Sequence, residues 1–510
     1  MAARTGTSRR NMIGAGLAAG GAAWTGMPEA AAGSMPNVYE SIGVRPVINC
    51  KGTFTIVSGS QTLPEVKQAM DAASRHYVHL DELMDGVGRR LAELTKAEWG
   101  IVTAGCAAAL THATSACVAG ANPERMQRLP DLTGLKNEVV MPLACRNVYD
   151  HAIRMVGVKM VTPATREEFL ASLRPSTAMV ALLGEAMDRN FMTVAEVADA
   201  AHKQGIPILV DAAAEKFSVP NSYLKDGADM VAYSGGKSLR GPQCAGVLLG
   251  RKDLLQSAWI NSAPHHAFGR SLKVGKEEIM GMLAAVEMWT RRDHEAEWKQ
   301  WLAWLHTISG KVKTLPGVNT EILQPNGVSN VTPSLRISWD NEKLPWNGEA
   351  AAEALLQGMP RILVPGQASS LTVTPWMMMP GDDRIAAIRS HEVLSKPPAS
   401  AAEPPPAIGT QLAGAWDVDI AFLRGPATHT IFIEQTGGRL AGTHRGEFLS
   451  GDLHGKFDGK RARFGSSHRY EGTSIGYQFD GVLDGGLIRG SVDLGEYGKA
   501  NFTARRHFRA

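Results

Sequence analysis

The chain has 510 residues, too many for one ordinary hydrophobic core, and this length predicts two or three domains. Hydrophobic residues make up 44% of the sequence and charged residues 20%, which is typical of a soluble globular protein. The formal net charge of +3 is small for this size, so we expect no nucleic-acid partner of the kind that a strongly basic surface would attract.

The first 33 residues follow the arrangement of an export signal, a charged region, an apolar region and a cleavage site, and not that of a folded domain. Arg9 and Arg10 form a twin-arginine pattern, a weakly apolar run follows over 12–24, and Ala30-Ala31-Ala32 offers a cleavage site. The apolar run is too short and too rich in glycine for a permanent membrane span. The pattern predicts that the twin-arginine translocase is a partner during export and that the mature protein is periplasmic or secreted.

After an N-terminal arm over 34–60, the sequence predicts a large α/β domain over 61–268. Helices are expected over 64–75 and 86–98, and apolar strand-like runs then alternate with helical segments. The strands are continuously apolar, which favours a buried, mostly parallel sheet flanked by helices. The expected strands are 138–141, 159–162, 178–183, 206–211, 230–233 and 246–249.

Three further segments complete the expected organisation. A long helix over 275–307 predicts the beginning of a small α+β domain, which we place at 269–394. Residues 395–409 are rich in proline and alanine and are typical of an extended linker. Residues 410–510 contain about eight short strands separated by glycine-rich turns, which predicts an antiparallel meander that closes into a barrel.

The most informative motif is a lysine that follows a buried strand. Lys237 stands behind Ser234-Gly235-Gly236, and Asp211 ends the apolar run 206–211 that lies upstream. Such a pair is what pyridoxal phosphate chemistry requires, because the lysine amine binds the cofactor aldehyde and the aspartate keeps the pyridine nitrogen protonated. We expect Lys237 and Asp211 to be the catalytic residues.

A phosphate group needs backbone N–H donors at the beginning of a helix. The turn Gly105-Cys106-Ala107 opens a predicted helix and is the candidate phosphate site, with Cys106 where a hydroxyl would be expected. Ser234 is a second candidate phosphate donor. A helix cap at Asp211 and a solvent-exposed loop lysine at Lys237 are the structural alternatives when each residue is taken alone.

Four segments resemble the selenocysteine synthase family of pyridoxal-phosphate enzymes, and within it the D-glucosaminate-6-phosphate ammonia-lyase branch. They are Val47-Ile48-Asn49-Cys50-Lys51-Gly52-Thr53, Leu91-Ala92-Glu93-Leu94-Thr95-Lys96-Ala97-Glu98, Ser234-Gly235-Gly236-Lys237 with Gly241-Pro242-Gln243, and 269–278. The resemblance implies a fold type I enzyme with Lys237 as the Schiff-base lysine and Asp211 as the pyridinium partner. It also implies a homodimer or larger homo-oligomer with active sites at the subunit interface.

Other polar residues are candidates for binding the substrate or the cofactor. Arg270, Lys273 and Lys276 cluster before a helix, where cations do not complement the helix dipole, and Lys276 is the candidate for the cofactor. Arg361 is a candidate for the substrate carboxylate, because arginine binds carboxylates bidentately. His265 is a candidate acid–base group at the substrate, and Asn147, Tyr149 and His151 could line the cofactor ring.

The cysteines do not form a metal-ligand pattern, and no metal site is expected. Buried free thiols are a simpler interpretation than one disulfide. The cysteines are Cys50, Cys106, Cys117, Cys145 and Cys244.

The leading functional hypothesis is a lyase that removes ammonia from a small amino-acid-like substrate, a polar amino acid or an amino sugar acid, by α,β-elimination. Alternatives with the same cofactor are racemisation, transamination and a selenium-transferase-like activity. A hypothesis of another class is an envelope binding protein in which the C-terminal β domain is the functional module.

Overall fold

The computed structural model of the chain describes residues 37–397 and 411–507. The expected export signal and most of the expected linker lie outside these residues. Among the described residues, 37–47 belong to one unit, with a short 3-10 helix at Glu40–Ile42, and the chain from Ile48 onward belongs to another. Within the described ranges, no helix is both long enough and apolar enough to cross a membrane.

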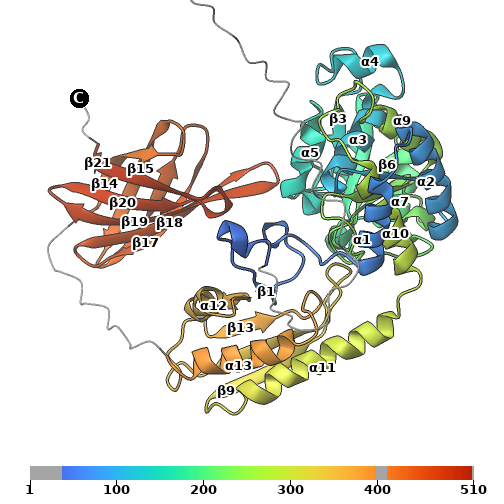
Figure 1. The fold of residues 1–510 in the computed structure, drawn as a ribbon. Helices are drawn as coiled ribbons and strands as arrows, with labels where there is room; N and C mark the ends of the chain where they lie inside the picture. The colour runs from blue at the N-terminus through green and yellow to red at the C-terminus, as the bar shows by residue number, and fades with distance from the viewer. Residues whose placement is uncertain (1–36, 398–410, 508–510) are drawn as a thin grey trace, which may run out of the picture. The chain divides into compact units, whose positions relative to one another are not determined.

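A sheet of seven strands forms the centre of the large domain, coloured blue to green in Figure 1. The inner strands pair in parallel, and only β8 runs antiparallel to its two neighbours. This sheet confirms the predicted mostly parallel fold type I core. In order across the sheet, the strands are β2 (Trp99–Thr103), β8 (Gly246–Gly250), β7 (Met230–Ser234), β6 (Ile208–Asp211), β5 (Thr177–Leu183), β3 (Glu138–Val140) and β4 (Lys159–Val161).

Helix α3 (Cys106–Ala119) is the buried helix of this domain. It consists largely of small residues, nearly all of them buried, and it packs against β5, β6, β7 and β8. Small side chains let its backbone approach the sheet closely. The other helices of the domain are α1 (Pro64–Ser74), α2 (Leu80–Thr95), α4 (Pro123–Arg128), α5 (His151–Arg154), α6 (Arg166–Ser172), α7 (Val194–His202), α8 (Ser222–Lys225) and α9 (Lys252–Ile260).

Helix α2 begins six residues before the position that the sequence predicts. Gly86 and Gly88 both lie inside the helix. A Cβ atom at Gly88 would lie 2.4 Å from the ring of Trp99. The glycine therefore serves close packing between α2 and β2, and not a break in the helix.

The single helix expected over 275–307 is wrong, because the structure has two helices there. Helix α10 (Lys276–Trp289) ends at a short turn, and α11 (His294–Val312) begins where the Asp293 side chain accepts a hydrogen bond from the Ala296 N–H (2.9 Å). Helix α10 packs on α1 and α2 and belongs to the core of the large domain. Apart from Cys50 and the neighbouring Ile48, the residues of the second core come from α11 onward and not from residue 269.

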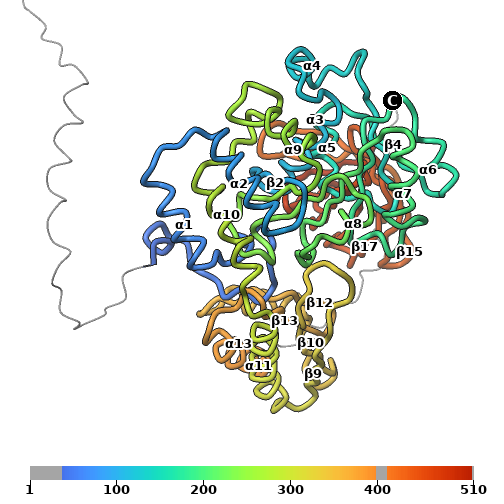
Figure 2. Tube along the Cα trace, turned by 90° about the vertical axis from the view of Figure 1, so that its right-hand side faces the viewer, coloured from blue at the N-terminus to red at the C-terminus, as the bar shows by residue number. Residues whose placement is uncertain are grey.

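Helices α11 and α13 (Asp382–Leu394) lie side by side in both views and cover the small domain (Figures 1 and 2). Its sheet has the order β12-β13-β10-β9 and is antiparallel. This arrangement confirms the predicted small α+β domain. Its elements are β9 (Val318–Leu323), β10 (Ser334–Trp339), β12 (Gly366–Gln367), β13 (Ser370–Val373) and α12 (Gly348–Gln357), and a separate pair joins β1 (Ile48–Asn49) to β11 (Ile362–Leu363).

Eight antiparallel strands close into a barrel, which confirms the predicted meander. Strand β14 pairs with β21, so the barrel presents no free sheet edge. Apolar side chains from all eight strands point inward and pack into one core. The strands are β14 (Gly414–Ala421), β15 (Pro426–Thr436), β16 (Arg439–Arg445), β17 (Ser450–Phe457), β18 (Arg461–Tyr470), β19 (Thr473–Asp484), β20 (Leu487–Asp493) and β21 (Lys499–Arg506).

Three histidines also lie inside the barrel. His429 Nδ1 is 2.9 Å from His444 Nε2, and His444 Nδ1 is 2.6 Å from Ser466 Oγ. The ring of His468 stacks obliquely on that of His444, with centroids 4.4 Å apart. Burial lowers the pKa of all three, that of His444 to about 3, so the imidazoles are neutral at neutral pH.

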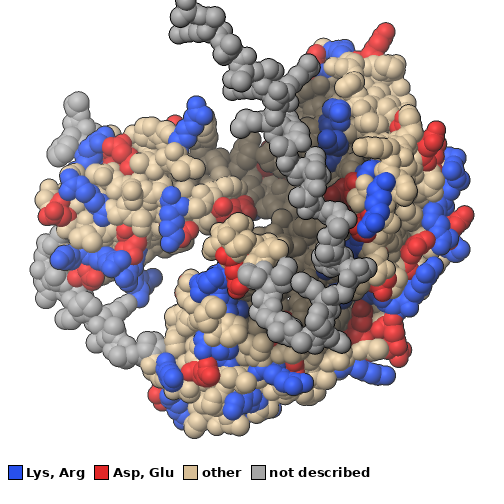
Figure 3. Space-filling view, in the orientation of Figure 1, with Lys and Arg blue, Asp and Glu red and all other residues tan. Residues whose placement is uncertain are grey.

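The five cysteines are unpaired, as expected, but they are not all buried, because Cys244 is exposed. In the described parts of the chain, no group of three His, Cys, Asp or Glu residues is arranged to hold a metal ion. Lys and Arg side chains are interspersed with Asp and Glu over the face shown in Figure 3, in keeping with the small net charge.

Candidate active site

Lys237 stands in a tightly packed loop just after β7. The Gly235 N–H donates to the Ala245 carbonyl and the Gly241 N–H donates to the Gly235 carbonyl, both at 2.8 Å. A Cβ atom at Gly235 would lie 2.6 Å from Met282 Sδ, so only glycine fits there. The Lys237 side chain is half-buried, and its amine makes no hydrogen bond or ion pair with any described residue. The loop therefore holds a lysine whose amine is available for a ligand.

Asp211 ends β6, the strand next to β7, and the two strands point the same way. Its side chain is only 5% exposed, and Oδ1 accepts a hydrogen bond from the Ala213 N–H (3.0 Å). Oδ2 has no hydrogen bond from any described residue. Burial raises the pKa of Asp211, and the positive charge of Lys237 only partly opposes this effect. A second cationic group against Oδ2 would stabilise the charged carboxylate.

The beginning of α3 lies at the same edge of the sheet as these strand ends. Gly105 caps the helix with φ +90°, and the first backbone N–H groups of α3 lack carbonyl partners inside the helix. A Cβ atom on Gly246 of β8 would lie 2.6 Å from the Gly105 carbonyl carbon. The glycines at 105 and 246 thus permit a turn whose N–H groups, including those of Cys106 and Ala107, can bind a phosphate.

The sequence suggested that Cys106 stands where a phosphate-binding hydroxyl would be expected. In the structure, its side chain contacts Asp211 instead. Its thiol lies 3.6 Å from Asp211 Oδ1 and donates to that carboxylate. Burial and the negative charge of Asp211 raise the pKa of Cys106 well above its usual value, so the thiol stays protonated. Cys106 therefore helps to hold Asp211, and only its backbone N–H belongs to the helix terminus.

The segment after β3 brings two of the candidate residues near Asp211. Asn147 and Asp211 line the same small cavity. Burial, and to a smaller extent the negative charge of Asp211, raises the pKa of Tyr149. His151 is exposed at the beginning of α5. Ser234 ends β7 and is half-buried beside the Lys237 loop.

The other candidates have partners elsewhere. Lys276 donates to the Ala73 carbonyl (3.0 Å) and pairs with Glu277, and His265 Nε2 lies 3.2 Å from Asp81. Arg270 is exposed, and Arg361 donates from Nε to the Leu356 carbonyl (2.8 Å). Within one described chain, Lys276, His265 and Arg270 make no hydrogen bond or ion pair with Lys237 or Asp211. Their proposed roles toward the substrate and the cofactor therefore stay predictions.

Glu215 is a buried carboxyl whose importance the sequence did not show. Tyr223 donates to its Oε2 (2.7 Å), whereas Oε1 is buried without a partner. Burial raises the pKa of Glu215 to about 7, and the negative charges of Asp211 and Glu185 add to this effect. A carboxyl four residues after Asp211 was the available signal, but burial is a tertiary property.

The raised pKa makes the stability of the protein depend on Glu215 and on pH. Because the folded state holds the proton more tightly than the unfolded state, stability falls as pH rises from about 4.5 through about 7. We expect Glu215→Gln to remove this loss and to be more stable than wild type at pH 8 by roughly 3 kcal/mol. Urea unfolding at several pH values measures the free energy of unfolding of both proteins. If this free energy depended on pH in the same way for the two proteins, the raised pKa of Glu215 would be contradicted.

A second cavity, of about 370 Å³, borders the residue after Lys237. Ser238 lines it, donates from Oγ to the Glu215 carbonyl (3.3 Å) and accepts a hydrogen bond from Arg292 through its own carbonyl (3.2 Å). This cavity was not predicted from the sequence, although three of its tryptophans recur at helical spacing on α11. The aromatic lining residues are Trp289, Trp298, Trp301, Trp304 and Trp376.

Comparison with known proteins agrees with this arrangement. The aminotransferase class-V family matches residues 143–269, which include Asp211 and Lys237. D-glucosaminate-6-phosphate ammonia lyase of Salmonella typhimurium is 30% identical over 303 residues, 57% of this chain and 79% of that protein. The chain belongs to the D-glucosaminate-6-phosphate ammonia-lyase family. A solved structure of a D-glucosaminate-6-phosphate ammonia-lyase has a TM-score of 0.64, at 25% identity over 71% of this chain and 98% of that one.

Two other proteins similar to this chain have different named activities. The 5'-C-glycyluridine monooxygenase-decarboxylase of a Streptomyces species is 28% identical over 378 residues, 71% of this chain and 93% of that protein. The L-seryl-tRNA(Sec) selenium transferase of Rhizobium meliloti is 27% identical over 320 residues, 57% of this chain and 65% of that protein. These likenesses confirm the resemblance on which the sequence analysis relied.

The chain is thus a pyridoxal-phosphate-dependent enzyme, and the residues at the strand ends fit that cofactor. Lys237 offers an unpaired amine, Asp211 offers a carboxylate oxygen without a partner, and α3 offers unpaired N–H groups. Each of these three features matches a different part of the cofactor: the aldehyde, the pyridine nitrogen and the phosphate.

Proposed function

We propose that the protein is a lyase that converts a small polar amino acid or amino sugar acid into a 2-oxo acid and ammonia by α,β-elimination. The observation that carries the proposal is the unpaired amine of Lys237 beside the buried carboxylate of Asp211. The 30%-identical ammonia lyase supports elimination as the reaction type.

Pyridoxal phosphate supplies an electron sink for the negative charge that develops at the substrate α-carbon. In our proposal, Asp211 holds the proton on the pyridine nitrogen, and the Cys106 thiol and the Ala213 N–H keep the carboxylate in place. The Lys237 amine holds the cofactor until the amine of the substrate takes its place, and the freed Lys237 amine would then accept the α-proton of the substrate as a base. The N–H groups at the beginning of α3 bind the phosphate, with Ser234 as a second candidate donor.

The monooxygenase-decarboxylase relative favours a second candidate reaction, in which the α-carboxylate is lost and not the β-substituent. Both reactions, and also racemisation and transamination, place negative charge on the same α-carbon. They differ in which bond of that carbon breaks and in what then leaves. Analysis of the products separates them.

The test uses the purified protein loaded with pyridoxal phosphate and a panel of D- and L-amino acids and amino sugar acids. We expect one compound to shift the visible absorption of the bound cofactor and to release ammonia in equal amount to a 2-oxo acid. Carbon dioxide without ammonia would support the second candidate. Inverted chirality without either gas would contradict the lyase.

We also propose that the protein is exported as a folded homo-oligomer, on the basis of the twin-arginine pattern and of the family. Replacement of Arg9 and Arg10 by lysine is expected to abolish delivery of the mature chain to the periplasm. Cell fractionation measures this, with the lysine variant of Arg4 as the matched control. Equal export of the two variants would contradict the proposal.

A further inference from the structure

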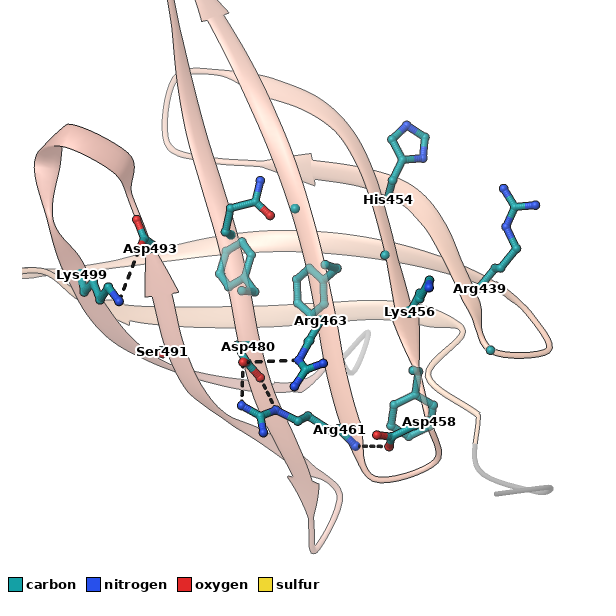
Figure 4. Close-up of a pocket in the computed structure, with 17 residues that line it drawn as sticks. Arg439, His454, Lys456, Asp458, Arg461, Arg463, Asp480, Ser491, Asp493 and Lys499 are labelled. Atoms are coloured by element: carbon teal, nitrogen blue, oxygen red, sulfur yellow. Dashed lines mark hydrogen bonds and ion pairs between the residues drawn. The ribbon is translucent and has the colours of Figure 1, made fainter. Parts of the chain in front are cut away.

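The outer face of the barrel carries a row of like charges. Arg439 on β16 stands directly opposite Lys456 on β17, and Lys456 stands directly opposite Arg463 on β18. All three side chains are exposed, while the residues next to them, such as Leu440, point into the core. Figure 4 shows the three cations side by side on neighbouring strands. We call Arg439, Lys456 and Arg463 the cationic row.

This row is unfavourable for the barrel by itself. Neighbouring strands lie about 4.8 Å apart, and like charges directly opposite each other destabilise a sheet. Asp480, the next residue across, already accepts a bidentate pair from Arg461 (2.6 and 2.7 Å) and lies 3.5 Å from Arg463. Neither Arg439 nor Lys456 has a carboxylate within 4.0 Å among the described residues. Packing of the barrel therefore gives no reason for the row.

The row borders a groove of about 1150 Å³. Gly465 keeps part of it open, because a Cβ atom there would lie 2.4 Å from Gln478 Oε1 on the neighbouring strand. Five cations and only three carboxylates line the groove. The lining also includes neutral hydrogen-bonding side chains, namely His454, Gln478 and Ser491.

The lining limits what the groove can bind. The aromatic residues that border it are buried in the barrel core and offer neither a platform on which bases could stack nor an apolar group for insertion into a membrane. The closed barrel has no free edge to which an extended peptide could add as a strand. An occupant with repeated negative charges and many hydroxyl groups fits the cations and the neutral polar side chains together. The buried aromatic residues are Phe457, Phe464 and Phe479.

We propose that this groove binds a linear polysaccharide that carries carboxylate groups. The carboxylates pair with the cationic row across β16, β17 and β18, and the sugar hydroxyls bond to His454, Gln478 and Ser491. The site is separate from the Lys237–Asp211 cluster, and the proposal does not depend on which reaction that cluster performs. The barrel is then a binding module joined to an enzyme.

The test uses the full chain and oligogalacturonate as the probe, with a neutral oligogalactose of the same length for comparison. Calorimetry at low salt is expected to show binding of the carboxylated probe alone, and added salt weakens it. The triple variant Arg439→Gln, Lys456→Gln and Arg463→Gln is expected to lose at least tenfold in affinity. Its unfolding temperature is expected to equal or exceed that of wild type, because the like-charge contacts are gone.

The matched control removes three exposed cations that lie on the barrel outside the groove, and it is expected to bind as wild type does. Loss of affinity in both triple variants, or in neither, would overturn the proposal. Binding of anionic lipid vesicles or of an acidic peptide in preference to oligogalacturonate would overturn it too, and so would equal binding of the neutral probe. The control changes are Arg445→Gln, Arg469→Gln and Arg489→Gln.

Discussion

Replacement of Lys237 by alanine is expected to reduce turnover by a factor of about a thousand or more. The variant loses both the amine that holds the cofactor and the base that accepts the substrate proton, and a positioned base alone contributes a factor of about 10²–10⁴. The visible absorption spectrum with added pyridoxal phosphate is expected to lack the band of lysine-bound cofactor. Ammonia release and this spectrum measure the two losses independently.

Lys225→Ala is the matched control, because Lys225 is an exposed lysine at the end of α8 in the same domain. It is expected to retain the spectrum and the activity of wild type. Full activity of the Lys237 variant would refute the assignment of Lys237. A retained spectrum with lost turnover would assign proton transfer to Lys237 but cofactor attachment to another group.

Asp211→Asn is expected to reduce turnover by about a hundredfold or more, which corresponds to roughly 2.7 kcal/mol in the barrier. A neutral amide cannot stabilise a proton on the pyridine nitrogen as a carboxylate does. Without cofactor, the free energy of unfolding at neutral pH is expected not to fall, because burial raises the pKa of Asp211 and makes its charged form unfavourable. Steady-state rates and urea unfolding of the cofactor-free chain measure the two effects.

Asp226, an exposed aspartate in the same domain, provides the control for the Asp211→Asn variant. Asp226→Asn is expected to leave both the rate and the stability unchanged. A large loss of stability in Asp211→Asn without cofactor would mean that the carboxylate is part of the folded framework. Its proposed role toward the pyridine nitrogen would then lose its support.

The sequence raised two hypotheses of different class, an enzyme and a binding protein that uses its C-terminal β domain. Both are compatible with this structure. Lys237 and Asp211, which we propose as the catalytic pair, end or follow neighbouring strands, and the comparisons show the cofactor family. The barrel closes on a packed core, so a ligand inside it is not needed to explain its interior. The groove on its outer face gives the barrel a binding role of its own beside the enzyme.

Local sequence patterns predicted the strands well, because a strand that is buried on both faces has a continuously apolar sequence. Continuous apolar runs such as 178–183 and 230–233 can only be inner strands, and glycine-rich turns at short spacing can only connect a meander. The helix boundaries were less well predicted. The glycines of α2 and the turn before α11 depend on what packs against them, namely Trp99 in the first case and a local hydrogen bond to Asp293 in the second.

The residues of the candidate site also fall into two groups, those whose position the sequence could predict and those whose contacts it could not. Lys237 and Asp211 follow strands that are parallel neighbours, and parallel strands end at one edge, so their meeting could be expected from sequence order. Lys276 was predicted at the site from a cluster of cations before a helix and His265 as an acid–base group, and the partners that the structure gives them, Ala73 and Asp81, come from remote segments. No local pattern could have shown those contacts.

The sequence by itself determined the class of the molecule, its strand-rich and helical segments and the two residues, Lys237 and Asp211, that we propose as catalytic, because these depend on composition and short-range order. Only the tertiary structure decided that the Cys106 thiol donates to Asp211, that Glu215 is buried beside Tyr223, and that three cations align across the barrel. Each of these depends on register and burial between segments far apart in the chain. The free energy of such contacts belongs to the packed fold and not to any segment alone.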